Sequence, residues 1–266
     1  MGADIKSLRT RIKSVTSTLQ LTRAMGLVAS SKIRKATQRM LDGRDYDAAL
    51  EQLLSLLTAS PECARSPYMQ VREGKTLLVV IAGDRGLAGG YNANIFRAAK
   101  EYPDAAMLPI GKRACDRFAG EVRLCEKFDG AEAYALATDL CRRYLAGEFT
   151  RLGILYTQYV SMMSQVPDVR WVLPLQKPEA VPPTAVLFEP DEASILETAV
   201  PEYVTGAIMA AVRESYACEV VARRMAMDSA GKNASEMIAD LQLQYNRARQ
   251  GSITQEITEI VAGANA

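Results

Sequence analysis

The sequence predicts a small α/β domain with a mainly parallel sheet, held between long N- and C-terminal helices that form an antiparallel coiled coil. Three observations predict this fold. All eleven prolines lie between Pro61 and Pro201, which leaves both ends free to form long helices. Apolar residues recur about every 3.5 residues in both ends, as in a coiled-coil seam. Between the ends, short apolar runs alternate with amphipathic segments, a pattern typical of alternating strands and helices.

The N-terminal segment predicts one helix of about 55 residues. Its seam steps by three and four residues through Ile5, Leu8, Ile12, Val15, Leu19, Thr22, Gly26, Ala29, Ile33, Ala36 and Met40. The pattern loosens from Gly43, but leucines keep a helical spacing up to Pro61. Such a helix would be roughly 80 Å long. Because this exceeds the diameter of any domain that the chain could build, we expect something outside the middle domain to cover part of it.

The C-terminal segment predicts a second long helix. Its seam runs through Met227, Ala230, Ala234, Met237, Leu241, Gln244 and Ala248, and then passes to Ile253, Ile257 and Ile260. Gly231 and Gly251 lie inside this helix, where each costs about 1 kcal/mol relative to alanine. Packing or a close backbone approach is the natural explanation for them.

The middle of the chain predicts alternating strands and helices, which together would form a small Rossmann-like domain. Strands are expected at residues 76–82, 107–110, 152–159 and 185–188, with a weaker one at 170–173. Helices are expected at residues 93–101, 113–118 and 132–146. The resulting domain prediction is an N-terminal coiled-coil helix at 1–58, an α/β domain at 75–190 and a C-terminal coiled-coil helix at 202–264.

Composition excludes several classes of active site. The sequence has no histidine, which removes Ser-His-Asp and Cys-His nucleophiles and His-ligated zinc or haem. Its five cysteines show no C-x-x-C spacing, so we expect buried thiols rather than a disulfide framework or a zinc site. The longest uncharged run, at 152–167, is shorter than the ~20 apolar residues of a membrane span. The charged, helical N-terminus is unlike a signal peptide.

Charge is balanced overall but not locally. Lys and Arg number 32 against 31 for Asp and Glu, which argues against a generally basic nucleic-acid binder. Residues 1–41 nevertheless hold four Lys and five Arg against Asp4 alone. Lys32, Arg34, Lys35 and Arg39 crowd one stretch of this basic arm. The arm lacks aromatic residues, which disfavours base stacking on single-stranded nucleic acid.

A glycine-rich segment at 83–90 joins the first predicted strand to a predicted helix. It contains Asp84, Arg85, Gly86, Gly89 and Gly90. Loops at this place in α/β domains often hold phosphate on their backbone N–H groups. This one matches neither G-x-G-x-x-G nor G-x-x-x-x-G-K-[ST]. A structural turn, with Asp84 or Asn92 capping, is therefore favoured over a nucleotide site.

Acidic residues at 189–192 precede the predicted C-terminal helix. A carboxylate at a helix start interacts favourably with the helix dipole. We therefore interpret these residues as a helix start rather than as acid–base catalysts.

Three stretches carry a resemblance to a known family: RIKSVTSTLQLTRAMGLVASSKIRKA at 11–36, DRGLAGGYN at 84–92, and MAMDSAGKNASEMIADLQLQYNRARQGSITQEITEIVAGA at 225–264. With them the chain resembles the gamma subunit of the rotary F-type ATP synthase, in its bacterial form. It departs from the family pattern at Gly26, usually an acidic residue, at Ala88, often Cys, and at Gly251, usually Ala.

The resemblance implies a central rotor shaft that couples proton or sodium translocation to ATP synthesis or hydrolysis. The implied partners are a hexamer of alpha and beta subunits around the helices, with the epsilon subunit and the c-ring at the α/β domain. The chain itself would be non-catalytic, without cofactor, metal or nucleic acid. It would be peripheral to the cytoplasmic face of the bacterial cell membrane, with no span of its own. Positions implied to contact the ring or to brace the two helices are Met25, Arg223, Arg249, Gln250, Thr254 and Glu256.

Two alternatives remain open from the residues alone. The first is a nucleotide-binding α/β enzyme with helical dimerisation arms, which ATP binding to the chain would favour. The second is a coiled-coil scaffold whose basic arm contacts nucleic acid, which salt-dependent DNA retention by residues 1–60 would favour.

Overall fold

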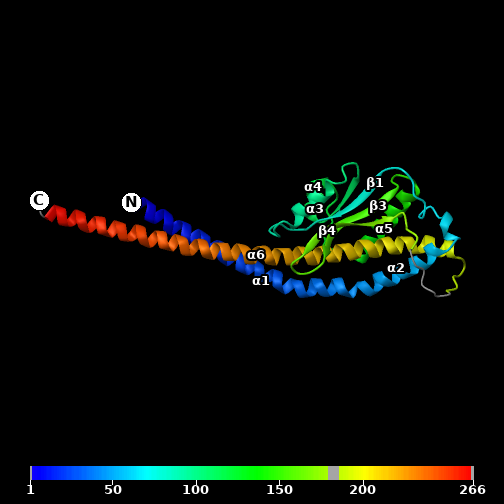
Figure 1. Ribbon diagram of the computed structural model, residues 1–266, viewed down its shortest axis with the longest axis horizontal. Helices are drawn as coiled ribbons and strands as arrows, with labels where there is room; N and C mark the ends of the chain where they lie inside the picture. The colour runs from blue at the N-terminus through cyan, green and yellow to red at the C-terminus, as the bar shows by residue number, and fades with distance from the viewer. Residues whose placement is uncertain (1, 179–185, 265–266) are drawn as a thin grey trace. The chain divides into compact units, whose positions relative to one another are not determined.

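The computed structural model describes residues 2–178 and 186–264 (Figure 1). The chain divides into two compact units. The sheet unit comprises residues 31–222, and the coiled-coil unit comprises residues 1–30 together with 223–266.

A four-stranded sheet forms the centre of the sheet unit, in the order β2-β1-β3-β4. Its strands are β1 (Thr76–Ile81), β2 (Ala106–Ile110), β3 (Arg151–Tyr159) and β4 (Gln165–Leu173). β1 is parallel to β2 and β3, and β4 is antiparallel to β3. The prediction of a mainly parallel sheet is thus confirmed, although β4 is longer than the weak strand expected at 170–173.

The strand predicted at 185–188 is wrong. Residues 186–188 form no strand, and position 185 lies outside the described residues. Leu187 is largely exposed, whereas Phe188 is partly buried against the main core. Residues 186–188 have no sheet neighbour to pair their backbone groups as in a strand, and a short apolar run does not reveal this from its pattern.

Helices cover both faces of the sheet. The helices of the middle segment are α3 (Tyr91–Ala99), α4 (Lys112–Phe118) and α5 (Gly130–Leu145). Side chains of β1 alternate between the two faces, as the pleat of a strand requires. Leu78 and Val80 belong to a cluster with residues of α3 and α4, whereas Val79 belongs to the main core with residues of α5 and α6 (Glu192–Ala264).

The helix α6 is long and apolar enough, by length and composition, to cross a membrane, but half of its most apolar 18-residue window is buried inside the protein. From Leu196 to Val212 its buried residues belong to the main core of the sheet unit. Packing against the sheet accounts for the apolar character of this part of the helix.

The single N-terminal helix that the sequence predicts is interrupted at Gly43. It forms α1 (Gly2–Asp42) and α2 (Arg44–Ala59), and a short 3-10 helix, η1, follows at Cys63–Arg65. A Cβ atom at Gly43 would lie only 2.3 Å from Nη1 of Arg213 on α6. Glycine at this position therefore lets the Arg213 side chain pass close to the backbone.

The coiled-coil unit consists of the first part of α1 and the last part of α6. A Cβ at Gly26 would lie 3.6 Å from Cβ of Met227, and one at Gly231 would lie 3.7 Å from Oγ1 of Thr22. Residues earlier in α1 thus contact residues later in α6. The predicted antiparallel pairing of the first and last helices is confirmed.

The seam of α1 is predicted correctly, and that of α6 is predicted correctly only in part. Met227, Ala234 and Leu241 are buried as expected, whereas Met237 is 43% exposed. Gln244 is also exposed, and the half-buried neighbours Ile238 and Tyr245 replace these two residues in the seam. The buried residues at 227, 234 and 241 keep the predicted spacing of seven, and the second position of each later repeat follows after four residues instead of three.

The end of α6 extends past the N-terminus of α1 (Figure 1). Ile253, Ile257 and Ile260, which the sequence assigns to the seam, are all exposed, Ile260 by 70%. Among the described residues, nothing outside the helix lies within 4 Å of a Cβ built at Gly251. These isoleucines therefore form an uncovered apolar tip.

The cysteines behave as the composition predicts. Cys63, Cys115, Cys125, Cys141 and Cys218 are all free and buried. Burial raises the pKa of Cys141 and of Cys218 to about 12, so these thiols remain protonated at neutral pH.

Candidate interaction surfaces and the glycine-rich loop

The glycine-rich loop leaves the carboxyl end of β1 and ends where α3 begins. Gly89 has a φ of 58°, in the left-handed region that glycine adopts without strain. Leu87 has a φ of 60° and is 63% exposed. A leucine in this conformation is uncommon. The next residue, Ala88, is buried.

Asp84 connects the loop to two other segments. Its carboxylate accepts hydrogen bonds from the backbone N–H of Cys125 at 3.0 Å, of Glu126 at 2.9 Å and of Lys112, the first residue of α4, at 3.3 Å. Asn92 accepts from the N–H of Gly83 at 2.8 Å. The sequence suggests that Asp84 or Asn92 caps a helix here. Neither caps α3, because Gly90 precedes that helix without a side-chain cap. Both instead hold the loop itself.

The decisive contact of the loop comes from Glu219 on α6, which is 1% exposed. Its carboxylate accepts from the backbone N–H of Asp84 at 3.4 Å and of Arg85 at 3.2 Å. A Cβ at Gly83 would lie 2.8 Å from Cδ of Glu219, so glycine is needed for the approach. The N–H groups that would face a phosphate in a nucleotide-binding loop therefore face a carboxylate of the same chain. A nucleotide would have to displace this buried anion, which disfavours the enzyme alternative.

Sequence reasoning missed Glu219. The available signal was its setting in the run Ala217-Cys218-Glu219-Val220-Val221, where one carboxylate lies among apolar residues. A charge inside the apolar part of a helix requires a hydrogen-bonding partner. The pattern does not say which partner, since the loop it meets lies more than 130 residues away in the sequence.

The six residues implied to contact the ring or to brace the helices all lie in the coiled-coil unit. Met25 and Arg223 are half-buried, in the segment where Gly26 faces Arg224. The other four, Arg249, Gln250, Thr254 and Glu256, are exposed on the last part of α6. They form a second group, further along the helix.

Local hydrogen bonds order part of this second group. Thr254 Oγ1 donates to the carbonyl oxygen of Gln250 at 2.9 Å, and Glu256 accepts from the hydroxyl of Ser252 at 3.3 Å. The amide of Gln250 projects from an exposed helix face. This face can form neutral hydrogen bonds to another protein.

The acidic residues before α6 behave as a helix start. Asp191 accepts from the backbone N–H of Ser194 at 2.8 Å, and this hydrogen bond lowers the pKa of Asp191. α6 begins at Glu192. The geometry is that of an N-cap.

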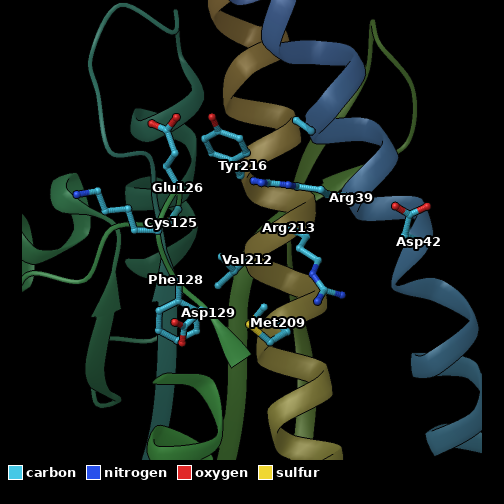
Figure 2. Close-up of a pocket in the computed structure, with 12 residues that line it drawn as sticks. Arg39, Asp42, Cys125, Glu126, Phe128, Asp129, Met209, Val212, Arg213 and Tyr216 are labelled. Carbon is cyan, nitrogen blue, oxygen red and sulfur yellow. The ribbon is translucent and has the colours of Figure 1, made fainter. Parts of the chain in front are cut away.

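A pocket of about 410 Å³ opens in the sheet unit between α1, α6 and residues 125–129 (Figure 2). Its lining includes three cations and three carboxylates, namely Arg39, Lys127 and Arg213 with Asp42, Glu126 and Asp129. This mixture favours neither an anionic nor a cationic ligand. Across the described parts of the chain, no group of three or more Cys, Asp or Glu side chains is placed to hold a metal ion.

One residue of the basic arm is paired next to this pocket. Lys32 Nζ lies 2.6 Å from a carboxylate oxygen of Glu126. The hydrogen bond raises the pKa of Lys32 and lowers that of Glu126. Arg34, Lys35 and Arg39 remain exposed.

Comparison with known proteins identifies the family. The family model for ATP synthase matches residues 4–266. The ATP synthase gamma chain of Ruminococcus albus is 38% identical, over 97% of this chain and 96% of its own length. That of Desulforamulus reducens is 39% identical over 99% of both chains. The chain belongs to the ATP synthase gamma-chain family.

Solved structures share the fold of this gamma-family chain. A chain of the Euglena gracilis mitochondrial ATP synthase, from a structure of OSCP/F1/c-ring, matches with a TM-score of 0.71 at 18% identity, covering 100% of this chain and 95% of its own. A chain of the Tetrahymena thermophila central stalk and c-ring matches with a TM-score of 0.62 at 20% identity, over 79% of this chain and 99% of its own. The predicted combination of a small α/β domain and long terminal helices is thus the fold of known central-stalk chains.

Proposed function

We propose that this gamma-family chain is the central rotor shaft of an F-type ATP synthase, coupling ion translocation in the membrane sector to ATP synthesis or hydrolysis by rotation. The observation that carries the proposal is family membership along the whole chain. The antiparallel helix pair supports it, because torque transmission needs a stiff element and two packed helices provide one. The exposed tip supports it as well, since Ile253, Ile257 and Ile260 need a surrounding protein to cover them.

The partners follow from the same assignment. A hexamer of alpha and beta subunits would surround the coiled-coil unit, and the sheet unit would meet the epsilon subunit and the c-ring. The chain would be peripheral to the cytoplasmic face of a bacterial cell membrane. It would take part in hydrogen-ion or sodium-ion transport without conducting the ion itself.

The chain would be a non-catalytic subunit. The loop that most resembles a phosphate site has its N–H groups at Asp84 and Arg85 bonded to Glu219. Met25 and Arg223 would brace the helices or meet the ring near Gly26, and Arg249, Gln250, Thr254 and Glu256 would meet the ring at the tip. The loop residues Asp84, Arg85, Gly86, Gly89 and Gly90 would serve a structural role beside a subunit interface.

The test is assembly. Co-expressed with alpha and beta subunits of the same source, the chain should co-purify at one copy per hexamer, and vesicles holding the complete complex should pump ions when ATP is added. Absence of the chain from the purified hexamer, or unchanged pumping when the chain is omitted, would refute the proposal.

A second experiment separates this function from the enzyme alternative. Calorimetry on the purified chain should detect no binding of ATP or ADP at millimolar concentration. Saturable binding that is abolished by Gly86→Val would instead support a nucleotide site in the loop.

A further inference from the structure

Between Glu214 and Glu219, α6 is bonded to the carboxyl-terminal edge of the sheet by its side chains. Glu214 accepts from the backbone N–H of Tyr159 at 2.7 Å, and Ser215 Oγ accepts from that of Thr157 at 3.2 Å. Both amides lie at the end of β3. All these residues belong to the sheet unit.

Glu219 makes the corresponding bonds at the end of β1, through the N–H groups of Asp84 and Arg85. The same stretch of α6 is therefore bonded to the ends of two adjacent parallel strands. The residues Glu214, Ser215 and Glu219 are called the α6 joint below.

Ser215 and Glu219 are buried in the joint, whereas Glu214 is half-buried. Ser215 is 0% exposed, and the hydroxyl of Tyr91 donates to its carbonyl oxygen at 2.9 Å. Burial raises the pKa of Tyr91 well above its ordinary value, so its hydroxyl remains a donor. Water is therefore excluded from Ser215 and Glu219, and their hydrogen bonds keep a defined geometry.

A buried carboxylate is a costly way to pack a helix on a sheet. An apolar side chain at position 219 would fill the space without the desolvation cost of a charge. The carboxylate instead fixes the orientation of the helix against the loop. Apolar contacts resist separation but allow side chains to slide and re-pack, whereas hydrogen bonds to an ionised acceptor are strong and orientation-dependent.

We propose that Glu219 is a positioning residue that locks the rotational setting of α6 against the sheet, so that torque enters the shaft helix through the α6 joint. The inference rests on the proposed rotor function. α6 continues without interruption from the joint into the coiled-coil unit. Torque that the joint withstands without slipping is therefore transmitted along one continuous helix.

The test uses the assembled complex with Glu219→Gln, which preserves shape but removes the charge. Glu197→Gln is the matched control, because it makes the same change at an exposed position of α6. A cysteine at exposed Asp104, just before β2, would carry a bead, and the five native thiols are buried and would not be labelled.

Three measurements are made on each complex. Hydrogen exchange of the loop peptide containing Asp84 and Arg85 should accelerate roughly tenfold or more in Glu219→Gln. The angular variance of the bead during catalytic pauses, which is inversely proportional to torsional stiffness, should rise about twofold or more, reflecting the weakened charge-assisted bonds. The ratio of ions pumped to ATP hydrolysed should fall, while Glu197→Gln behaves as the unmodified complex.

Ser215→Ala provides a second variant if Glu219→Gln does not assemble, because it removes the acceptor of the Thr157 N–H within the same joint. Its bead variance should rise in the same way. The proposal would be overturned if the loop peptide of Glu219→Gln exchanges faster while the bead variance and the pumping ratio stay unchanged. Failure of the unmodified chain to assemble or to support pumping would instead count against the rotor function itself.

Discussion

At the scale of single residues, carboxylates organise the carboxyl-terminal edge of the sheet. Asp84 receives three backbone N–H groups from two segments, and Glu219 receives two from the loop. Each bond to an ionised acceptor contributes more than a neutral one, and removing the acceptor leaves the N–H donors without that partner. Asp84 was identified from sequence as part of a structural loop, whereas its actual partners could not be, because they lie about 30 to 40 residues further along the chain.

The ion pair between Lys32 and Glu126 gives a prediction at this scale. Lys32→Met should raise the pKa of Glu126, because the hydrogen bond from Lys32 is the main cause of its lowered value. The pair contributes stability above the ordinary pKa of glutamate, and that contribution fades as pH falls through the lowered pKa. Carbon-13 titration of the Glu126 carboxyl group measures the shift. Arg34→Met, an exposed neighbour, is the control and should leave the pKa of Glu126 unchanged.

At the scale of elements, the glycines Gly26 and Gly231 differ in how tightly the facing helix packs against them. A Cβ at Gly26 would lie 3.0 Å from Nη1 of Arg224, which is tight, so this glycine has a packing reason. At Gly231 the nearest atoms outside the helix would lie at 3.7 and 3.8 Å, an ordinary contact distance. Close approach, suggested from sequence for Gly231, is therefore not its explanation.

Gly231→Ala should consequently stabilise the coiled-coil unit. The added methyl group fits, and the gain in helix propensity is about 1 kcal/mol. Thermal unfolding of the purified chain, supported by hydrogen exchange around position 231, measures the effect. Gly26→Ala is the comparison and should gain less, since the Arg224 side chain must move. A loss of stability in Gly231→Ala would show that the backbone there requires glycine.

The antiparallel register gives a second prediction for the helices. Thr22→Cys combined with Gly231→Cys should form an intramolecular disulfide under mild oxidation, because these positions face each other in the coiled-coil unit. The native thiols are buried and can be retained. Non-reducing gels distinguish the products. Dimers in place of an internally crosslinked monomer would indicate that the helices are dimerisation arms.

At the scale of the whole molecule, the chain is a subunit with an exposed apolar and neutral polar surface that a partner would cover. The tip of α6 combines isoleucines with Gln250 and Thr254, groups that form hydrogen bonds of about 1 kcal/mol each. Such contacts can be made and broken repeatedly during rotation. A buried ion pair costs several kcal/mol when one partner is removed and would create a deep stop.

Met25→Lys tests this account of the shaft. Met25 is half-buried on α1, and the proposal that it meets the ring predicts that a cation there adds a strong contact. We expect the variant to assemble normally but to pump fewer ions for each ATP hydrolysed. ATPase activity and ion pumping in inverted vesicles measure the ratio, and a native gel verifies assembly. An unchanged ratio would contradict the placement of Met25 near the ring.

Replacing both Gln250 and Thr254 by Ala tests the tip. The double variant loses a neutral hydrogen-bonding side chain at each position, so we expect a reduced ATPase turnover with unchanged subunit stoichiometry. The reduction should be about fivefold for each lost hydrogen bond of about 1 kcal/mol, and at most about thirtyfold for the two together. Full turnover in an intact complex would show that these residues do not contact the ring productively.

The sequence by itself determined the fold class, the two long helices and their antiparallel pairing, because these depend on periodicity and on the distribution of proline, which are local properties of the chain. It also carried the family motifs at both ends and in the loop. Tertiary structure alone decided the break at Gly43, where Arg213 of α6 passes close to the backbone, and the absence of a strand at 186–188. It also decided that the Glu219 carboxylate would accept the loop N–H groups that hold a phosphate in nucleotide-binding loops. Each of these depends on contacts between residues far apart in sequence, and short-range patterns carry no information about which distant group supplies a partner.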